Sequence, residues 1–222
     1  MAHEADAKGS VHRLVLSCFP REGVVVIRVA SMLVLIAWGG MCRVALAGGD
    51  GPMPFHLDPA QSRLWFDADA RLHTFRGETQ QLTGRFTLQR RSPPQLSDAS
   101  VAIKAASLET GNAERDADMR RDFLEVERFP TIEFRVDEVL TPQATAGEAT
   151  WDLVLQGKLM VHGVIRDIKV PTTVSLSDER VTARGRIHLD MRDYSIRVPR
   201  LFLVPMKSEV LVAFEVVARP AR

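Results

Sequence analysis

Apolar and polar residues alternate along most of the chain after residue 60, and this pattern constrains the fold more than any other feature. Between Ser62 and Leu72 the even positions are mostly apolar, whereas the odd positions are mostly charged. A period of two is typical of a β-strand with one buried face. The alternation recurs in seven further segments, at 82–88, 101–105, 132–136, 151–161, 168–176, 181–191 and 210–216. Because mostly short polar connections separate the segments, we predict an all-β fold with eight antiparallel strands in a barrel or sandwich.

One segment between the third and fourth predicted strands, Gly111 to Pro130, has a different period. Met119, Phe123 and Val126 recur at helical spacing, and Asn112 is a suitable N-cap residue. The proline at the end of the segment is expected to stop the helix. We therefore predict one or two short helices that lie over one end of the barrel and pack these three side chains against it.

The first 47 residues have the features of a secretory signal peptide. A basic residue precedes an apolar run from Val29 to Cys42, and Ala45-Leu46-Ala47 has the small-x-small pattern that signal peptidase cleaves. The run is shorter than the ~20 residues that span a bilayer, so we favour export over a retained anchor. We predict a periplasmic protein with a signal peptide at 1–47, a linker at 48–54 and one domain at 55–219.

The charge balance of the predicted mature chain excludes some classes of partner. Residues 1–47 hold five of the 29 basic and three of the 28 acidic residues, which leaves a net charge of −1, and they also hold both cysteines. A nearly neutral chain has no overall field to hold nucleic acid, and a chain without cysteine has no disulfides. Outward positions such as Lys104, Glu133 and Asp152 are charged, so we do not expect a membrane-embedded barrel.

No familiar catalytic or metal-binding motif is found in the sequence. Four histidines are scattered over different strands, and we expect no metal site from His56, His73, His162 and His188. Asp118 and Asp122 would share a helix face, but the neighbouring arginines favour a solvated charged surface over acid–base catalysis. Five arginines lie between Arg184 and Arg200, where an ordinary exposed hairpin is favoured over a basic rim for an anionic head group.

The size of the side chains that point into the barrel determines whether it has a packed core or a cavity. An eight-stranded barrel either fills itself with side chains or holds one small ligand. Small inward residues would leave volume unfilled, although glycines can instead relieve curvature at barrel bends. We favour an apolar cavity and predict that Gly157→Leu and Gly185→Leu fill it with little loss of stability and a sharp loss of lipid binding. The expected lining is Phe66, Ala68, Phe86, Ile103, Phe134, Val136, Leu153, Leu155, Gly157, Val174, Gly185, Ile187, Val212 and Phe214.

Several longer stretches resemble the YceI-like proteins, a family of exported lipocalin-like barrels described as polyisoprenoid-binding. They are "FHLDPAQSRLWF", "SLETGNAERDADMRRDFLEVERFPTIEF", "LQGKLMVHGVIRDIKVP", "DYSI" and "SEVLVAFEVVA". The most specific parts are Arg115-Asp116 followed by Phe129 to Phe134, and the frame Gly157 to Val164. Two residues depart from the family pattern, Ile165 where threonine is usual and Ser195 where glycine is usual, so we expect the polar contacts near these points to differ. The resemblance implies an eight-stranded antiparallel barrel whose apolar pore holds an isoprenoid, quinone-like or acyl chain.

Two functions remain open. The first is a periplasmic binding or carrier protein that sequesters an amphipathic lipid, with no cofactor other than this ligand. The alternative is an enzyme that acts on an isoprenoid or acyl lipid at the barrel mouth, with Asp116, Asp118 and His73 as the acid–base set. Transient contact with a membrane or a membrane redox protein, and a homodimer, are left open as further partners.

The signal-peptide assignment predicts that the mature protein begins at Gly48. N-terminal sequencing of exported material should find this residue first, because cleavage follows Ala47. Acylated Cys42, or retained residues before Ala47, would contradict the assignment.

Overall fold

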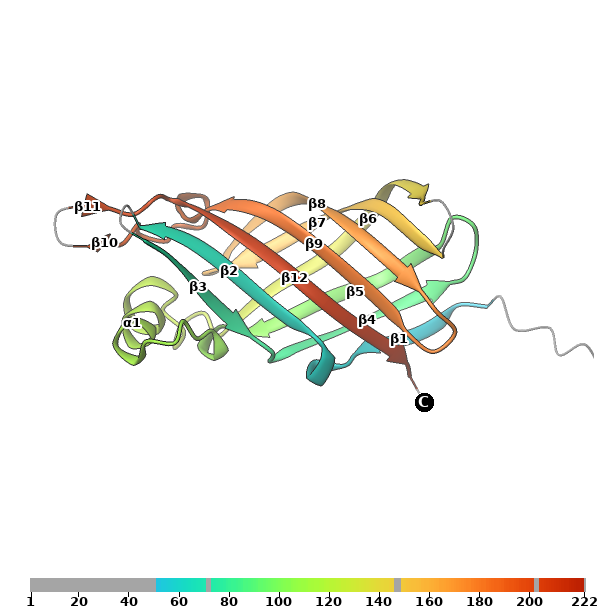
Figure 1. Cartoon of the computed structure of the whole chain (residues 1–222), viewed down its shortest axis with the longest axis horizontal. Helices are drawn as coiled ribbons and strands as arrows, with labels where there is room; N and C mark the ends of the chain where they lie inside the picture. The colour runs from blue at the N-terminus through green and yellow to red at the C-terminus, as the bar shows by residue number, and fades with distance from the viewer. Residues whose placement is uncertain (1–50, 71–72, 146–148, 202–203, 222) are drawn as a thin grey trace, which may run out of the picture. The chain divides into compact units, whose positions relative to one another are not determined.

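A computed structural model describes residues 51–70, 73–145, 149–201 and 204–221, in which twelve strands are assigned (Figure 1). The signal peptide predicted at 1–47 lies outside the described residues. Ten of the strands form one antiparallel sheet in the order β1-β4-β5-β6-β7-β8-β9-β12-β2-β3, and β10 pairs with β11. The strands are β1 (Met53–Leu57), β2 (Arg63–Ala70), β3 (His73–Thr79), β4 (Leu82–Gln89), β5 (Gln95–Lys104), β6 (Thr131–Ala144), β7 (Thr150–Val161), β8 (Val164–Leu176), β9 (Val181–Asp190), β10 (Arg200–Leu201), β11 (Val204–Pro205) and β12 (Glu209–Pro220).

The large sheet closes into a barrel because β12 also pairs with β1. The register places β1 beside residues 218–220 of β12 and β2 beside residues 210–215, so β1 and β2 follow each other along one partner. Similarly, β3 pairs with β2 and β4 pairs with β1. The ten strands therefore occupy eight places around the barrel, which confirms the predicted eight-stranded antiparallel fold.

Besides the two-residue strands β10 and β11, two strands of the large sheet are absent from the prediction. The first, β1, begins at Met53 inside the expected linker, so the barrel starts two residues before 55. It is short, and its alternation covers too few residues to stand out. The second, β3, has the inward positions Phe75, Gly77 and Thr79, of which only Phe75 is a large apolar side chain. Each short strand is ordered by its neighbours, which the periodicity of a single segment does not show.

A buried serine bridges the break between β1 and β2. The break is a 3-10 turn, η1 (Pro59–Gln61), and Ser62 follows it with only 1% of its surface exposed. The Val217 N–H donates to Ser62 Oγ at 3.0 Å, and Ser62 Oγ–H donates to the Val217 carbonyl at 3.3 Å. The Asp58 N–H also donates to this carbonyl, at 2.8 Å. These bonds satisfy the backbone of β12 where the ladder is interrupted.

The predicted helical segment lies between β5 and β6 and covers one end of the barrel (Figure 1). It consists of α1 (Ala113–Asp118) and a π-helical turn, η3 (Met119–Phe123). Asn112 is the N-cap as predicted, since its side chain accepts from the Arg115 N–H at 2.9 Å. The helical part ends earlier than expected. Val126 and Pro130 both follow Glu125, which has a φ of 44° and interrupts the helical backbone.

The buried apolar residues form two separate clusters instead of one continuous core. One cluster gathers Phe55, Leu57, Leu82 and Leu88 with residues of β5, β9 and β12. The other joins β7 to the segment after β9 through Leu159, Val161, Tyr194 and Ile196. Many inward side chains of the intervening strands are only partly buried. Because a close-packed interior would bury them, this distribution indicates unfilled space inside the barrel.

The expected role of two inward glycines is wrong. A Cβ atom at Gly157 would lie 2.1 Å from the Arg135 carbonyl oxygen, and one at Gly185 would lie 2.7 Å from the Pro171 carbonyl oxygen. The β6–β7 register shifts just beyond Val136, where it faces Gly157, so the backbone of β6 approaches β7 closely there. These glycines therefore allow close backbone contact at a bend of the wall and do not leave room for a ligand.

Gly157→Ala should consequently destabilise the barrel by about 2 kcal/mol or more, because the new methyl group collides with backbone that has little freedom to move. Thermal unfolding of the delipidated variant measures the loss. Gly51→Ala is the matched control, since a Cβ there meets nothing within 4 Å. An unchanged Tm for Gly157→Ala would restore the interpretation that the glycine leaves free volume.

Candidate ligand cavity

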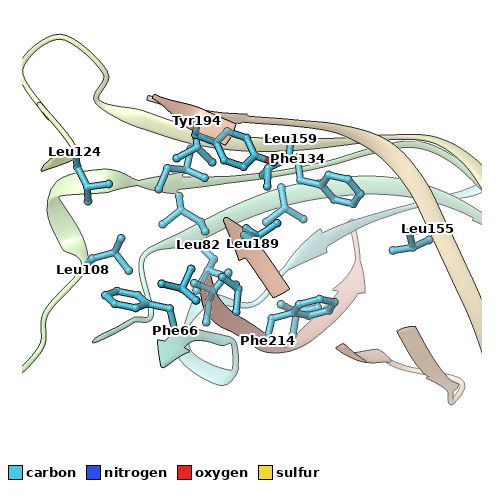
Figure 2. A pocket seen from close by; sticks show the side chains of 18 of the residues that line it. Phe66, Leu82, Leu108, Leu124, Phe134, Leu155, Leu159, Leu189, Tyr194 and Phe214 are labelled. Carbon is cyan, nitrogen blue, oxygen red and sulfur yellow. The ribbon is translucent and has the colours of Figure 1, made fainter. Parts of the chain in front are cut away.

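A cavity of about 880 Å³ lies inside the barrel and is lined almost entirely by apolar side chains. Figure 2 shows part of this lining, with Phe66, Phe134, Leu155, Leu189 and Phe214 among the labelled side chains. The lining residues come from strands all around the barrel and from the helical segment. The volume falls within the ~300–1,000 Å³ that is usual for small-molecule sites.

Most of the predicted lining residues border this cavity. They are Phe66, Ala68, Phe86, Ile103, Phe134, Val136, Leu153, Leu155, Val174, Val212 and Phe214. Gly157, Gly185 and Ile187 do not border it. The first two face the backbone contacts described above, and Gly185 instead borders a shallower hollow formed with outward residues such as Trp65 and Arg186. Contact of any of these residues with a ligand remains a prediction.

The end of the cavity beneath the helical segment includes residues that the strand periodicity did not single out. Leu108, Met119, Phe123 and Leu124 reach it from the connection between β5 and β6, and Tyr194 reaches it from the turn after β9. Met119 and Phe123 were predicted to pack against the barrel end, and this helical pattern was the available signal. Burial raises the pKa of Tyr194 to about 12, so its phenol stays neutral near pH 7.

The Arg115-Asp116 pair of α1 organises the loop at this end. Asp116 is buried, and Thr110 donates to its Oδ1 through the backbone N–H at 2.8 Å and through the hydroxyl at 2.5 Å. Arg115 donates to Thr110 Oγ1 at 2.7 Å and to the Thr110 carbonyl at 2.9 Å, while its guanidinium lies 4.5 Å from the centre of the Phe75 ring. The pair thus has a structural role in holding the loop.

Three other acidic residues near this end, Asp118, Asp122 and Asp190, are paired with arginines. Arg121 donates to Asp118 at 2.6 Å and to Asp122 at 2.7 Å, on the exposed face of the helical segment. The hydrogen bond from Arg121 lowers the pKa of Asp122. Likewise, the hydrogen bonds from Arg192 hold the pKa of Asp190 far below its usual range. Asp122 and Asp190 therefore stay ionised near neutral pH, and the exposed ion pairs of Arg121 agree with the predicted solvated charged surface.

The histidines do not gather into one site. His162 Nδ1 lies 3.2 Å from the Tyr194 carbonyl oxygen and its Nε2 lies 3.2 Å from Glu125 Oε1, whereas His188 contacts Glu209 on the outer wall. Of His73, only the backbone is described. No cluster of metal-ligating side chains is found within the described ranges.

The arginines between Arg184 and Arg200 are divided among different elements. Arg184 pairs with Glu215 on the outer wall at 2.6 Å, and Arg192 pairs with Asp190 at 2.6 Å. Arg197 donates to the Asp122 carbonyl at 3.1 Å. The side chain of Arg200 is outside the described part. The described arginines therefore do not converge into a single basic rim.

Within the described part of the chain, no helix has the length and apolarity required to cross a membrane.

The sequence profile of the YceI-like domain family matches residues 55–218. Curated relatives are also similar. A UPF0312 protein of Pseudomonas savastanoi pv. phaseolicola is 33% identical over 113 residues, which cover 48% of this chain and 56% of the relative. One of Pseudomonas putida GB-1 is 31% identical over 130 residues, or 55% of this chain and 64% of the relative. The chain thus spans between about half and two thirds of the length of these relatives.

Solved structures share the fold. BcnA of Burkholderia cenocepacia superposes with a TM-score of 0.60 at 17% identity, over 72% of this chain and 98% of that protein. A polyisoprenoid-binding domain of Saccharophagus degradans, implicated in plant cell wall breakdown, superposes with a TM-score of 0.57 at 19% identity, over 76% of this chain and 99% of that domain. At these identities the likeness shows the barrel fold alone.

The contacts of Asp116 predict a purely structural role. Asp116→Ala should lower the free energy of unfolding by about 2 kcal/mol, because the Thr110 N–H would lose its acceptor in a largely buried site. Asp118→Ala is the control and should change stability by less than ~1 kcal/mol, since Asp118 belongs to an exposed ion pair. Thermal unfolding of both variants makes the comparison. Equal stability of the two would contradict the structural role and reopen the catalytic one.

Proposed function

The chain belongs to the YceI-like family, and from that premise we propose that it binds one long-chain amphipathic lipid in the barrel. The expected ligands are a polyisoprenoid, an isoprenoid quinone or an acyl chain. The similar barrel of Saccharophagus degradans is a polyisoprenoid-binding domain, which supports this ligand class. The observation that carries the proposal is the apolar cavity of about 880 Å³ in the barrel interior.

Burial of a hydrocarbon chain supplies enough free energy for tight binding without any chemical step. Each buried CH₂ group contributes ~0.8 kcal/mol, so a tail of ten to fifteen carbons gives ~8–12 kcal/mol before ordering and association costs are subtracted. Because this energy is not directional, an apolar wall selects for chain length and bulk more than for chemical identity. The apolar lining therefore selects lipids with a long hydrocarbon chain. Discrimination between different head groups depends on the polar residues that border the cavity.

A binding protein is favoured over an enzyme by the state of the candidate acid–base residues. Asp116 is held by Thr110, and Asp118 is paired with Arg121. A general acid or base needs a pKa matched to its task and an available position beside the substrate. Both carboxylates already have partners within the protein, and of the third candidate, His73, only the backbone is described.

The proposal places the protein in the periplasm, where it would carry or sequester the lipid after export. This location depends on the signal-peptide pattern that ends at Ala47. Contact with a membrane or a membrane redox protein would provide a source or destination for the lipid. Mass spectrometry of organic extracts from gently purified protein would identify the ligand directly.

Ala183 offers a way to fill the cavity. It borders the cavity on β9 and is only partly buried, so a larger side chain there has space to enter. Ala183→Phe should weaken binding of a fluorescent long-chain lipid about ten-fold or more while Tm stays nearly constant, because the ring occupies volume that the tail requires.

The matched control is Ala102→Phe on β5, where Ala102 pairs with Thr83 and Glu133 and does not border the cavity. It should leave lipid affinity unchanged. Undiminished binding by a stable Ala183→Phe variant would place the ligand outside the barrel and end the proposal.

A further inference from the structure

The strands β4 and β5 are neighbours in the barrel wall (Figure 1), and their pairing is interrupted by a shift of register. Arg85 pairs with Ser100, but the next pair is Thr87 with Ser97, so two residues of β5 lie opposite Phe86, one more than regular pairing would place there. These are Asp98 and Ala99, and Asp98 has a φ of 52°. A bulge of this kind leaves residues unpaired and bends the strand, which opens the ladder locally.

The cavity extends into this interruption. Alternation along β4 and β5 directs Phe86 and Val101 inward and directs Arg85 and Ser100 outward. Nevertheless, Arg85, Ala99 and Ser100 all border the cavity. Arg85 and Ser100 are outward residues that nevertheless border the interior space, which indicates that the bulge opens the wall here. We call this opening the β4–β5 window and define it by Arg85, Ala99 and Ser100.

The polar groups of the window are available to a ligand. Within the described residues, no hydrogen bond or ion pair engages the side chain of Arg85 or Ser100. The titratable neighbours along the strands are His56, which pairs with Arg85 across β1 and β4, the exposed Asp98 in the bulge, and Arg135 of β6, which pairs with Ser100 and adds a second positive charge. A guanidinium beside a hydroxyl offers several donors to a carboxylate or a phosphate.

Within the part of the chain that the structure describes, the helical end of the cavity, unlike the window, offers no available cation to an anionic group. Of the charged residues that border the cavity there, Arg115 already donates to Thr110, while Asp118 and Asp190 are paired with arginines. Glu114 also borders the cavity, and no cation pairs with it among the described residues. An anionic group would therefore meet no free donor cation at the helical end and would be repelled by Glu114, whereas Arg85 attracts it at the window.

We propose that the β4–β5 window binds the anionic end, a carboxylate or a phosphate, of the long-chain ligand. This inference rests on the proposed lipid-binding function and names the chemistry of the head group. The tail enters the apolar interior from the window, and Arg85 and Ser100 donate hydrogen bonds to the anionic oxygens. The ligand class is thereby narrowed to long-chain anions such as fatty acids or prenyl and alkyl phosphates.

The test compares ligands that share a chain and differ at the end. Delipidated protein is titrated with oleate, oleyl phosphate and oleyl alcohol by displacement of a fluorescent lipid, at a pH where the anions are ionised. The unmodified protein should bind at least one anion about five-fold or more tightly than the alcohol, and Arg85→Gln should remove that preference while leaving alcohol binding unchanged. The relative affinities of oleate and oleyl phosphate distinguish the two head groups.

Two further variants act as controls. Arg85→Lys should retain most of the preference because it keeps the positive charge, and Arg186→Gln should retain all of it because Arg186 is exposed on β9 and does not border the cavity. Equal affinity of the unmodified protein for all three ligands, or a preference that survives Arg85→Gln, would overturn the assignment of the window and leave lipid binding intact. Failure of the unmodified protein to bind any of the three would instead refute the proposed function itself.

Discussion

Closure of the sheet through β12 is the constraint on which the rest of the structure depends. A sheet with this twist either exposes its edge strands or closes, and the antiparallel pairing of β12 with β1 closes it. The bonds between Ser62 and the Val217 backbone maintain this contact across the break in the first strand. The closed sheet also surrounds a volume that the side chains of the barrel do not fill. The pairing of β12 with β1 therefore both stabilises the fold and creates the cavity.

The sequence was sufficient to predict the barrel because the period of two persists over long strands such as β7 and β8. It was not sufficient for β1 and β3, which are short and include Pro54 and Gly77. The helical segment was recognised from Asn112, Met119 and Phe123. Its end depends on the positive φ of Glu125, and a glutamate does not predict this conformation. The local sequence pattern therefore identified the elements that are long or that begin at a recognisable capping residue.

The cavity lining was predicted well for large apolar residues and poorly for glycine. A large inward side chain has one direction to point, so Phe66, Phe134 and Phe214 could be placed from alternation alone. A glycine at an inward position has two readings, free volume or close backbone approach, and only the position of the neighbouring strand separates them. For Gly157 the Arg135 carbonyl decides between the two. The role of Arg85 was likewise out of reach, because it depends on a bulge in a different strand.

The pairing that completes the barrel joins the two ends of the domain, and this has a consequence for how the chain folds. The β7–β8 hairpin turns in two residues, His162 and Gly163, both with the positive φ that such a turn requires, so its contacts are local. Ser62 and Val217, by contrast, are 155 residues apart in sequence. Contacts of such separation carry a large loop-closure entropy and slow the folding of β-rich domains. The hairpin is therefore suited to form early and the seam late, so that until its last strand is in place the barrel remains an open sheet with its apolar face accessible to lipid.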